Sequence, residues 1–130
     1  MAALRVLLIE DNAGAREGLG RLLADEGYDV RTASTGETGL HSLVGFNADV
    51  VVCDFDLPGM NGLRVLRLVR AWRRDVLFVM LTSGTCDCDA DRALRAEADV
   101  YLTKPVDLRR LRGVLTEAGA TLPPAIGATF

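Results

Sequence analysis

Acidic, hydroxyl and lysine side chains follow four short apolar segments of this 130-residue sequence, each where the segment ends. These residues are Glu10 with Asp11, Asp54 with Asp56, Thr82, and Lys104. Carboxylate oxygens are ligands that Mg²⁺ prefers, and bound Mg²⁺ keeps positions for phosphate oxygens. A lysine ammonium and a threonine hydroxyl suit the other oxygens of a phosphoryl group. The residue types therefore favour phosphoryl transfer onto a carboxylate, with a metal ion and the lysine neutralising charge in transit.

Asp54 is the candidate that a structural role explains least well. It ends the run Val50–Cys53, whose β-branched residues are typical of a buried parallel strand. An unpaired carboxylate is costly in such a place. Clustered carboxylates also raise one another's pKa values unless they share a cation. We therefore expect Mg²⁺ between the acidic residues.

The other residues each have a structural alternative. Glu10 and Asp11 could cap a helix that follows them. Thr82 could serve only the strand that it ends, and Lys104 could be a solvated surface charge. The functional interpretation rests on the whole set, because four segment ends each supply a fitting group.

Strands and helices alternate along the chain. Apolar segments predict strands at residues 5–10, 28–33, 49–54, 76–82 and 99–104. Helical spacing predicts four helices, through Leu19, Leu22 and Leu23; Leu40, Leu43 and Val44; Leu63, Leu66 and Val69; and Leu108, Leu111, Val114 and Leu115. Residues 83–98 begin as a loop and continue as a helix with a weak apolar face. The expected boundary residues are Gly27, Ser34 or Thr35, and Asp107.

Five β-α units predict an α/β fold, a doubly wound five-stranded parallel sheet with helices on both faces. Ligands of such sheets bind beyond the carboxyl ends of the strands, near the point where the strand order reverses. The strand at 28–33 delivers no charged group there, as expected of an edge strand. The candidate residues are thus expected to meet at one rim of the sheet.

Composition narrows the class of protein. A net charge of -3 argues against direct nucleic-acid contact by this domain, and arginine supplies 14 of the 15 basic residues. No apolar stretch approaches the roughly 20 residues that span a bilayer, and the N-terminus lacks a signal-peptide pattern. We expect a cytoplasmic protein with no membrane contact. Cys86 and Cys88 cannot complete a tetrahedral metal site, so we expect them to be loop thiols.

Four motifs in order carry a resemblance to a known family. They are "LLIEDN", "VVVCDFDLPGMNGL", "VMLTSG" and "YLTKPVDLRRL". Over roughly residues 4–119 the chain resembles the receiver (phosphoacceptor) domain of bacterial two-component response regulators. The resemblance implies a flavodoxin-like sheet with strand order 2-1-3-4-5, a receiver domain at residues 1–119, and a C-terminal tail or the start of a linker at residues 120–130.

The resemblance also implies a metal site. Asp54 would be the phosphoacceptor and a ligand of Mg²⁺. Asp11 would bind the ion directly, and Glu10 would act through a water molecule or a neighbouring contact. Asp56 would offer its main-chain carbonyl.

The remaining implied roles concern the signal. Thr82 would hydrogen-bond the attached phosphoryl group, and Lys104 would pair with Asp54 or its phosphate. The peptide bond before Pro105 would be cis, as in the family. Tyr101 would be the aromatic switch residue that turns inward as Thr82 moves. The face formed by the fourth helix, fifth strand and fifth helix would then repack.

The implied partners are a sensor histidine kinase or a histidine phosphotransfer protein, and a downstream effector domain or protein. A homodimer that forms on phosphorylation is also implied. The domain would not be an enzyme in the usual sense, although it would catalyse its own phosphoryl transfer and its autodephosphorylation.

Departures from the family pattern and two rival functions complete the interpretation. Ser83 stands at a position where the family frequently has alanine, and Gly84 follows it. The Asp56 carboxylate adds negative charge next to the acyl phosphate, so the lifetime of the phosphate is in question. One rival is a phosphate-independent interaction module. The other is a phosphatase of the haloacid-dehalogenase type, whose D-x-D motif ends the first strand, whereas here Asp54 ends the third.

Overall fold

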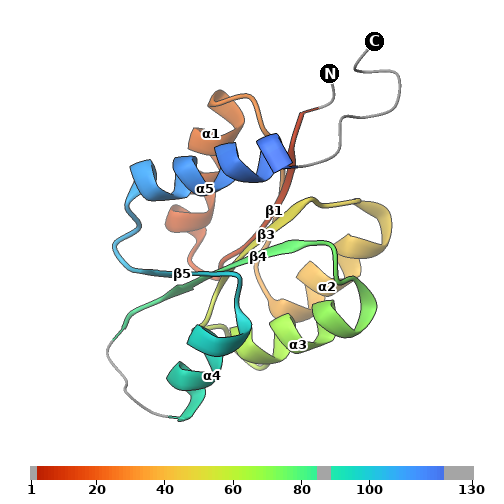
Figure 1. Cartoon of the computed structure of the whole chain (residues 1–130), viewed down its shortest axis with the longest axis vertical. Helices are drawn as coiled ribbons and strands as arrows, with labels where there is room; N and C mark the ends of the chain where they lie inside the picture. Colours follow the sequence, from red (N-terminus) through yellow and green to blue (C-terminus); the bar gives the residue numbers. More distant parts are fainter. Residues whose placement is uncertain (1–2, 85–88, 122–130) are drawn as a thin grey trace.

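The computed structural model describes residues 3–84 and 89–121, which form a layered α/β fold (Figure 1). The strands are β1 (Arg5–Ile9), β2 (Asp29–Ala33), β3 (Val50–Asp54), β4 (Leu77–Thr82) and β5 (Val100–Thr103). The helices are α1 (Ala13–Asp25), α2 (Gly36–Gly45), α3 (Gly62–Trp72), α4 (Asp89–Glu97) and α5 (Leu108–Thr121). The five strands form one parallel sheet in the order β2-β1-β3-β4-β5. The predicted fold and strand order are confirmed.

The sheet is covered on both faces, with α1 and α5 on one side and α2, α3 and α4 on the other (Figure 1). Alternate residues of each strand point to opposite faces. Val6 and Leu8 therefore pack with Leu111 of α5, in a cluster distinct from that of Leu7, which includes Leu66 of α3. The strand β3 is buried along its whole length, so its end is held firmly at the rim.

Four polar residues begin the helices. Asn12 caps α1 by accepting from Ala15 N, and Asn61 caps α3 by accepting from Arg64 N. Thr35, not Ser34, caps α2 in a reciprocal pair with Thr38. Asp107 accepts from Arg109 N at the start of α5, as predicted.

Three residues of the predicted apolar helix faces lie at the surface, namely Leu22, Val44 and Leu108. Val44 is exposed because it stands in the last turn of α2, and Phe46, just past the helix, fills the core there instead. Leu22 is 47% exposed, whereas Leu23 beside it is buried against the sheet. After α1, Gly27 adopts a φ of 98°, which permits the turn into β2.

Within residues 3–84 and 89–121, no helix combines the length and apolarity needed to cross a membrane. The predicted loop thiols Cys86 and Cys88 lie outside the described residues, as does most of the predicted tail, residues 122–130.

Candidate functional site

Asp54 ends β3 with its side chain buried at the rim of the sheet. Its Oδ1 accepts from the backbone N–H of Asp56 at 3.2 Å, which orients the carboxylate. The loop that follows turns back under it, and Gly62 packs so closely that a Cβ there would lie 2.8 Å from the carbonyl oxygen of Asp54. Glycine is therefore needed at this position for the start of α3 to pack against the backbone of Asp54 and Phe55.

Glu10 and Asp11 follow β1, and Glu10 is buried whereas Asp11 is exposed. Neither caps α1, because Asn12 does so. Instead, Nη1 of Arg16 donates to the carbonyl oxygens of Glu10 at 3.1 Å and Asp11 at 3.3 Å. The first turn of α1 thus holds the backbone that carries the two carboxylates. The capping alternative for Glu10 and Asp11 is excluded.

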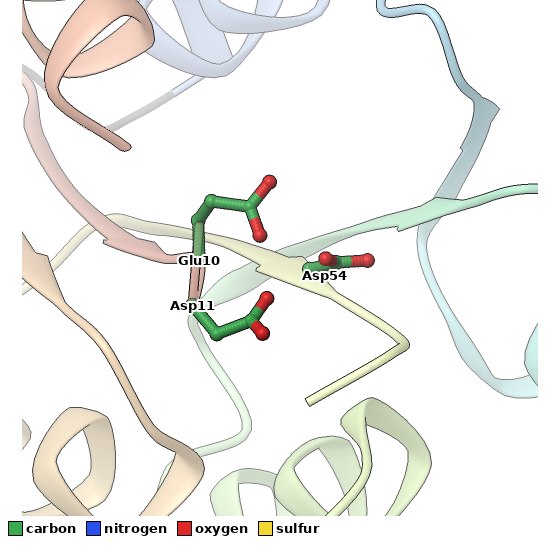
Figure 2. Close-up of side chains that lie close together, drawn as sticks. All are labelled: Glu10, Asp11 and Asp54. Atoms are coloured by element: carbon green, nitrogen blue, oxygen red, sulfur yellow. The ribbon is translucent and has the colours of Figure 1, made fainter. Parts of the chain in front are cut away.

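The three carboxylates point toward one another (Figure 2). One oxygen from each of Glu10, Asp11 and Asp54 lies within 4.8 Å of the others, which is a spacing that one cation can bridge. Oε2 of Glu10 is buried and has no hydrogen-bond partner among the described residues. A buried acceptor without a donor is costly, so the oxygen set fits a hard divalent ion such as Mg²⁺.

Lys104 brings a positive charge to the same cluster from the end of β5. Its Nζ lies 2.8 Å from Oδ2 of Asp54 and 3.2 Å from Oε1 of Glu10. Partial burial alone would lower the pKa of Lys104, but hydrogen bonds and attraction from the two carboxylates outweigh this and raise it. The peptide bond to Pro105 is cis, as predicted. The ammonium group of Lys104 is thus held by two ion pairs. The alternative that Lys104 is only a solvated surface charge is excluded.

The electrostatics of the cluster remain unbalanced despite Lys104. Burial, which is the largest cause, and the neighbouring negative charge of Asp54 together raise the pKa of Glu10 to about 7. The ammonium of Lys104 opposes these effects only in part. At neutral pH without a metal ion, Glu10 is therefore protonated in part of the molecules.

Thr82 ends β4 on the strand next to Asp54, where Leu81 is the register partner of Asp54. Thr82 is buried, and its Oγ1 accepts from the N–H of Gly84 at 3.3 Å. This is a long hydrogen bond, so the hydroxyl is weakly held. The structure thus brings Thr82 to the rim beside Asp54.

Tyr101 lies farther from the cluster, in the middle of β5 opposite Met80. It is half-buried, and the guanidinium of Arg95 on α4 stands 4.6 Å from the centre of its ring. This contact joins α4 to the strand that carries Lys104. Sequence reasoning missed both Arg95 and Arg16, because arginines on helix surfaces give no signal of what they contact across the fold.

The chain matches the response regulator receiver domain family over residues 6–116. Among its relatives is the transcriptional regulatory protein AfsQ1 of Streptomyces coelicolor, which is 40% identical over 115 residues, covering 85% of this chain and 50% of AfsQ1. The chain spans about half the length of the curated relatives it matches.

Two solved structures are similar in fold. The response regulator TrrA from Thermotoga maritima, in complex with Mg²⁺-BeF, has a TM-score of 0.78 and 30% identity, covering 88% of this chain and 98% of TrrA. The receiver domain of Ssk1 from Saccharomyces cerevisiae, crystallised with the histidine phosphotransfer protein Ypd1, has a TM-score of 0.80 and 25% identity. That match covers 92% of this chain and 90% of the other.

Proposed function

The chain belongs to the response regulator receiver domain family, whose members are phosphorylation-activated switches of two-component systems, and we propose that Asp54 is its phosphoacceptor. The observation that carries the proposal is the cluster of Glu10, Asp11 and Asp54 around a shared space, with Lys104 bonded to Asp54. The buried strand β3 ends at Asp54 and holds its carboxylate at the rim of the sheet, next to Glu10, Asp11 and Lys104.

The proposed donor is a phosphohistidine of a sensor kinase or of a phosphotransfer protein, and the complex of the similar Ssk1 receiver with Ypd1 supports this class. An oxygen of Asp54 attacks phosphorus while the bond from phosphorus to the imidazole nitrogen breaks. The imidazole keeps the electron pair and takes up a proton. We place this exchange in the cytoplasm.

Asp11 and Asp54 are the proposed side-chain ligands of Mg²⁺, Glu10 would act through a water molecule or a neighbouring contact, and the main-chain carbonyl of Asp56 completes the protein's set. Bound Mg²⁺ supplies positive charge that offsets the repulsion between the carboxylate and the incoming phosphoryl group. Lys104 is already 2.8 Å from Oδ2 of Asp54 and can follow the charge onto the phosphoryl oxygens. Water entering beside Asp56 would later hydrolyse the acyl phosphate.

Thr82 and Tyr101 are the proposed signalling residues. A phosphoryl group on Asp54 adds acceptor oxygens, and the weakly held Thr82 hydroxyl can turn toward them. The space that Thr82 leaves admits the ring of Tyr101, so its contact with Arg95 on α4 changes. The α4-β5-α5 face then differs between the two states, and a downstream effector or a second copy that reads this face is the proposed target.

Asp54→Asn tests the proposal most directly, and Asp56→Asn is the matched control. Each protein is incubated with acetyl phosphate, with and without Mg²⁺, and its intact mass is measured. We expect a Mg²⁺-dependent gain of about 80 Da in the wild type and in Asp56→Asn, because Asp56 contributes only its main chain, and none in Asp54→Asn.

A missing gain in the wild type must be separated from rapid hydrolysis, and binding of beryllofluoride, which does not hydrolyse in this way, separates them. Failure of both would overturn the phosphoacceptor proposal and favour the phosphate-independent interaction module. A gain that persists in Asp54→Asn would assign the phosphate to another residue.

A further inference from the structure

The outer face of α3 carries two large apolar side chains that the fold leaves at the surface. Trp72 is 54% exposed and Leu68 is 38% exposed. They stand four residues apart on one helix, so they lie side by side. Single exposed apolar residues are ordinary, but a tryptophan beside a leucine forms a ridge that water solvates poorly.

An open hollow of about 280 Å³ adjoins this ridge on the same helix, lined by Asn61, Leu63, Arg64, Arg67 and Leu68. Arg67 is neutralised in the hollow, because its guanidinium makes a bidentate pair with Glu97 at 3.0 and 2.8 Å. Arg64 has no ion-pair partner among the described residues. The exposed indole of Trp72 therefore stands at the C-terminal end of α3. The hollow, with the guanidinium of Arg64 that is unpaired among the described residues, lies toward the N-terminal end of the same helix.

We propose that this face binds a second copy of the chain, with the two α3 helices antiparallel about a two-fold axis at Leu68. Arg64 lies four residues before Leu68 and Trp72 lies four residues after it. In an antiparallel pair centred on Leu68, the indole of each copy therefore lies over the hollow of the other copy. The face of an indole attracts a guanidinium, which supplies complementarity for Arg64. A two-fold interface forms both contacts at once.

The size of the ridge sets the strength of this dimer. One helix ridge buries much less than the roughly 1,600 Å² of a standard interface, so we expect a dissociation constant on the order of 100 µM. The pairing of Arg67 with Glu97 limits repulsion near the axis. The ridge and the hollow include none of Glu10, Asp11 and Asp54, so we expect the dimer to form without the proposed phosphorylation.

Sedimentation velocity over about 10 µM to 1 mM protein tests the dimer, and tryptophan emission reports on the interface because Trp72 is the only tryptophan. We expect dimer to appear as concentration rises, with a blue shift of the emission. Leu68→Glu and Trp72→Ala should each weaken association at least roughly tenfold. Leu22→Gln, which changes an exposed leucine on α1, should leave it unchanged.

Cross-linking tests the antiparallel register, in a background where Cys86 and Cys88 are serine so that native thiols do not compete. Leu68→Cys should form an intermolecular disulfide on oxidation, because its two copies meet at the axis. Arg64→Cys should not, because its copies stand about 12 Å apart along the helices.

Two results would overturn the proposal. If the wild type stays monomeric up to 1 mM, the ridge does not bind a second copy of the chain, and a different protein is the alternative partner. A dimer that survives both Leu68→Glu and Trp72→Ala, with circular dichroism showing folded variants, would place the interface elsewhere, for example on the α4-β5-α5 face.

Discussion

Carboxylates stand at both ends of the parallel sheet, but their surroundings differ. Asp49 and Asp99 each precede a strand. Oδ2 of Asp49 accepts from Arg5 N at 2.9 Å, and Oδ2 of Asp99 accepts from Phe78 N at 2.7 Å and pairs with Arg70. Each of these carboxylates thus completes the hydrogen bonds of a neighbouring strand, with donors from the fold itself.

Glu10, Asp11 and Asp54 follow their strands, and the fold supplies them with fewer hydrogen-bond donors and positive charges. Lys104 is their only ion-pair partner among the described residues, and Oε2 of Glu10 has no donor at all there. Burial, and after it the negative charge of Asp54, raises the pKa of Glu10, and Lys104 offsets these effects only in part. The amino edge therefore uses carboxylates to build the sheet, whereas at the carboxyl edge the carboxylates are crowded together and only partly neutralised.

Replacing Lys104 with alanine should have the largest effect, because it removes the ion-pair partner of both Glu10 and Asp54. We expect the free energy of unfolding without metal to fall by about 2–3 kcal/mol at pH 7.5, less than for a fully buried pair, since the lysine side chain is 34% exposed. Urea denaturation in EDTA measures this. In the mass assay with Mg²⁺, phosphorylation of Asp54 should be weakened but not abolished.

Lys104→Arg is the matched control, because it keeps the charge with a different shape. It should retain most of the stability while phosphorylation falls, since the broad guanidinium cannot reproduce both contacts of Nζ. If Lys104→Ala were as stable as the wild type in EDTA, the carboxyl edge would not be short of positive charge, and the contrast with the amino edge would fail.

Replacing Asp99 with alanine should have a smaller effect, confined to stability. The change leaves Phe78 N and Nη2 of Arg70 without this acceptor, although Nη1 of Arg70 still donates to the carbonyl oxygen of Val76, so we expect a loss of about 1.5 kcal/mol by urea denaturation. Asp99→Asn retains an acceptor for Phe78 N and should recover roughly half of the loss. Phosphorylation should proceed at the wild-type rate in both, and a slowed rate in folded Asp99→Ala would show that the two edges are coupled.

The carboxyl edge could be predicted from the sequence because its signal is local. An apolar, β-branched run is followed directly by the charged Asp54, and this abrupt change in polarity is visible in the sequence. Similar changes mark Thr82 and Lys104 at the ends of their apolar segments. Parallel strands then bring such ends together without any knowledge of side-chain geometry. The sheet order and the cis bond before Pro105 were likewise within reach through the resemblance.

The features that escaped prediction depend on contacts between distant segments. Nothing near Asp99 in the sequence indicates that it bonds Phe78 N, 21 residues away. Val44 fits the helical pattern, but Phe46 takes its place in the core only because of where α2 ends. Helical spacing also does not reveal that Trp72 stays at the surface, because exposure depends on which neighbouring elements reach it.

Replacing Glu10 with glutamine should have the smallest effect and the opposite sign, since it relieves the carboxyl edge. The pKa of Glu10 is raised from 4.5 to about 7, so between these values the folded chain holds a proton that the unfolded chain has released. The free energy of unfolding of the metal-free wild type should therefore fall as pH rises from about 4.5 to 7, and then level off.

Glu10→Gln lacks this titration, so at pH 8 in EDTA it should be more stable than the wild type by about 1 kcal/mol, a figure reduced for screening by water. Urea denaturation at pH 5 and pH 8 gives the comparison, and Glu17→Gln, an exposed change on α1, is the control. Saturating Mg²⁺ should reverse the order, because the wild type gains binding energy that the variant has in part lost. A variant that is less stable than the wild type in EDTA at pH 8 would mean that Glu10, like Asp99, serves the fold, and that the two edges of the sheet do not differ in kind.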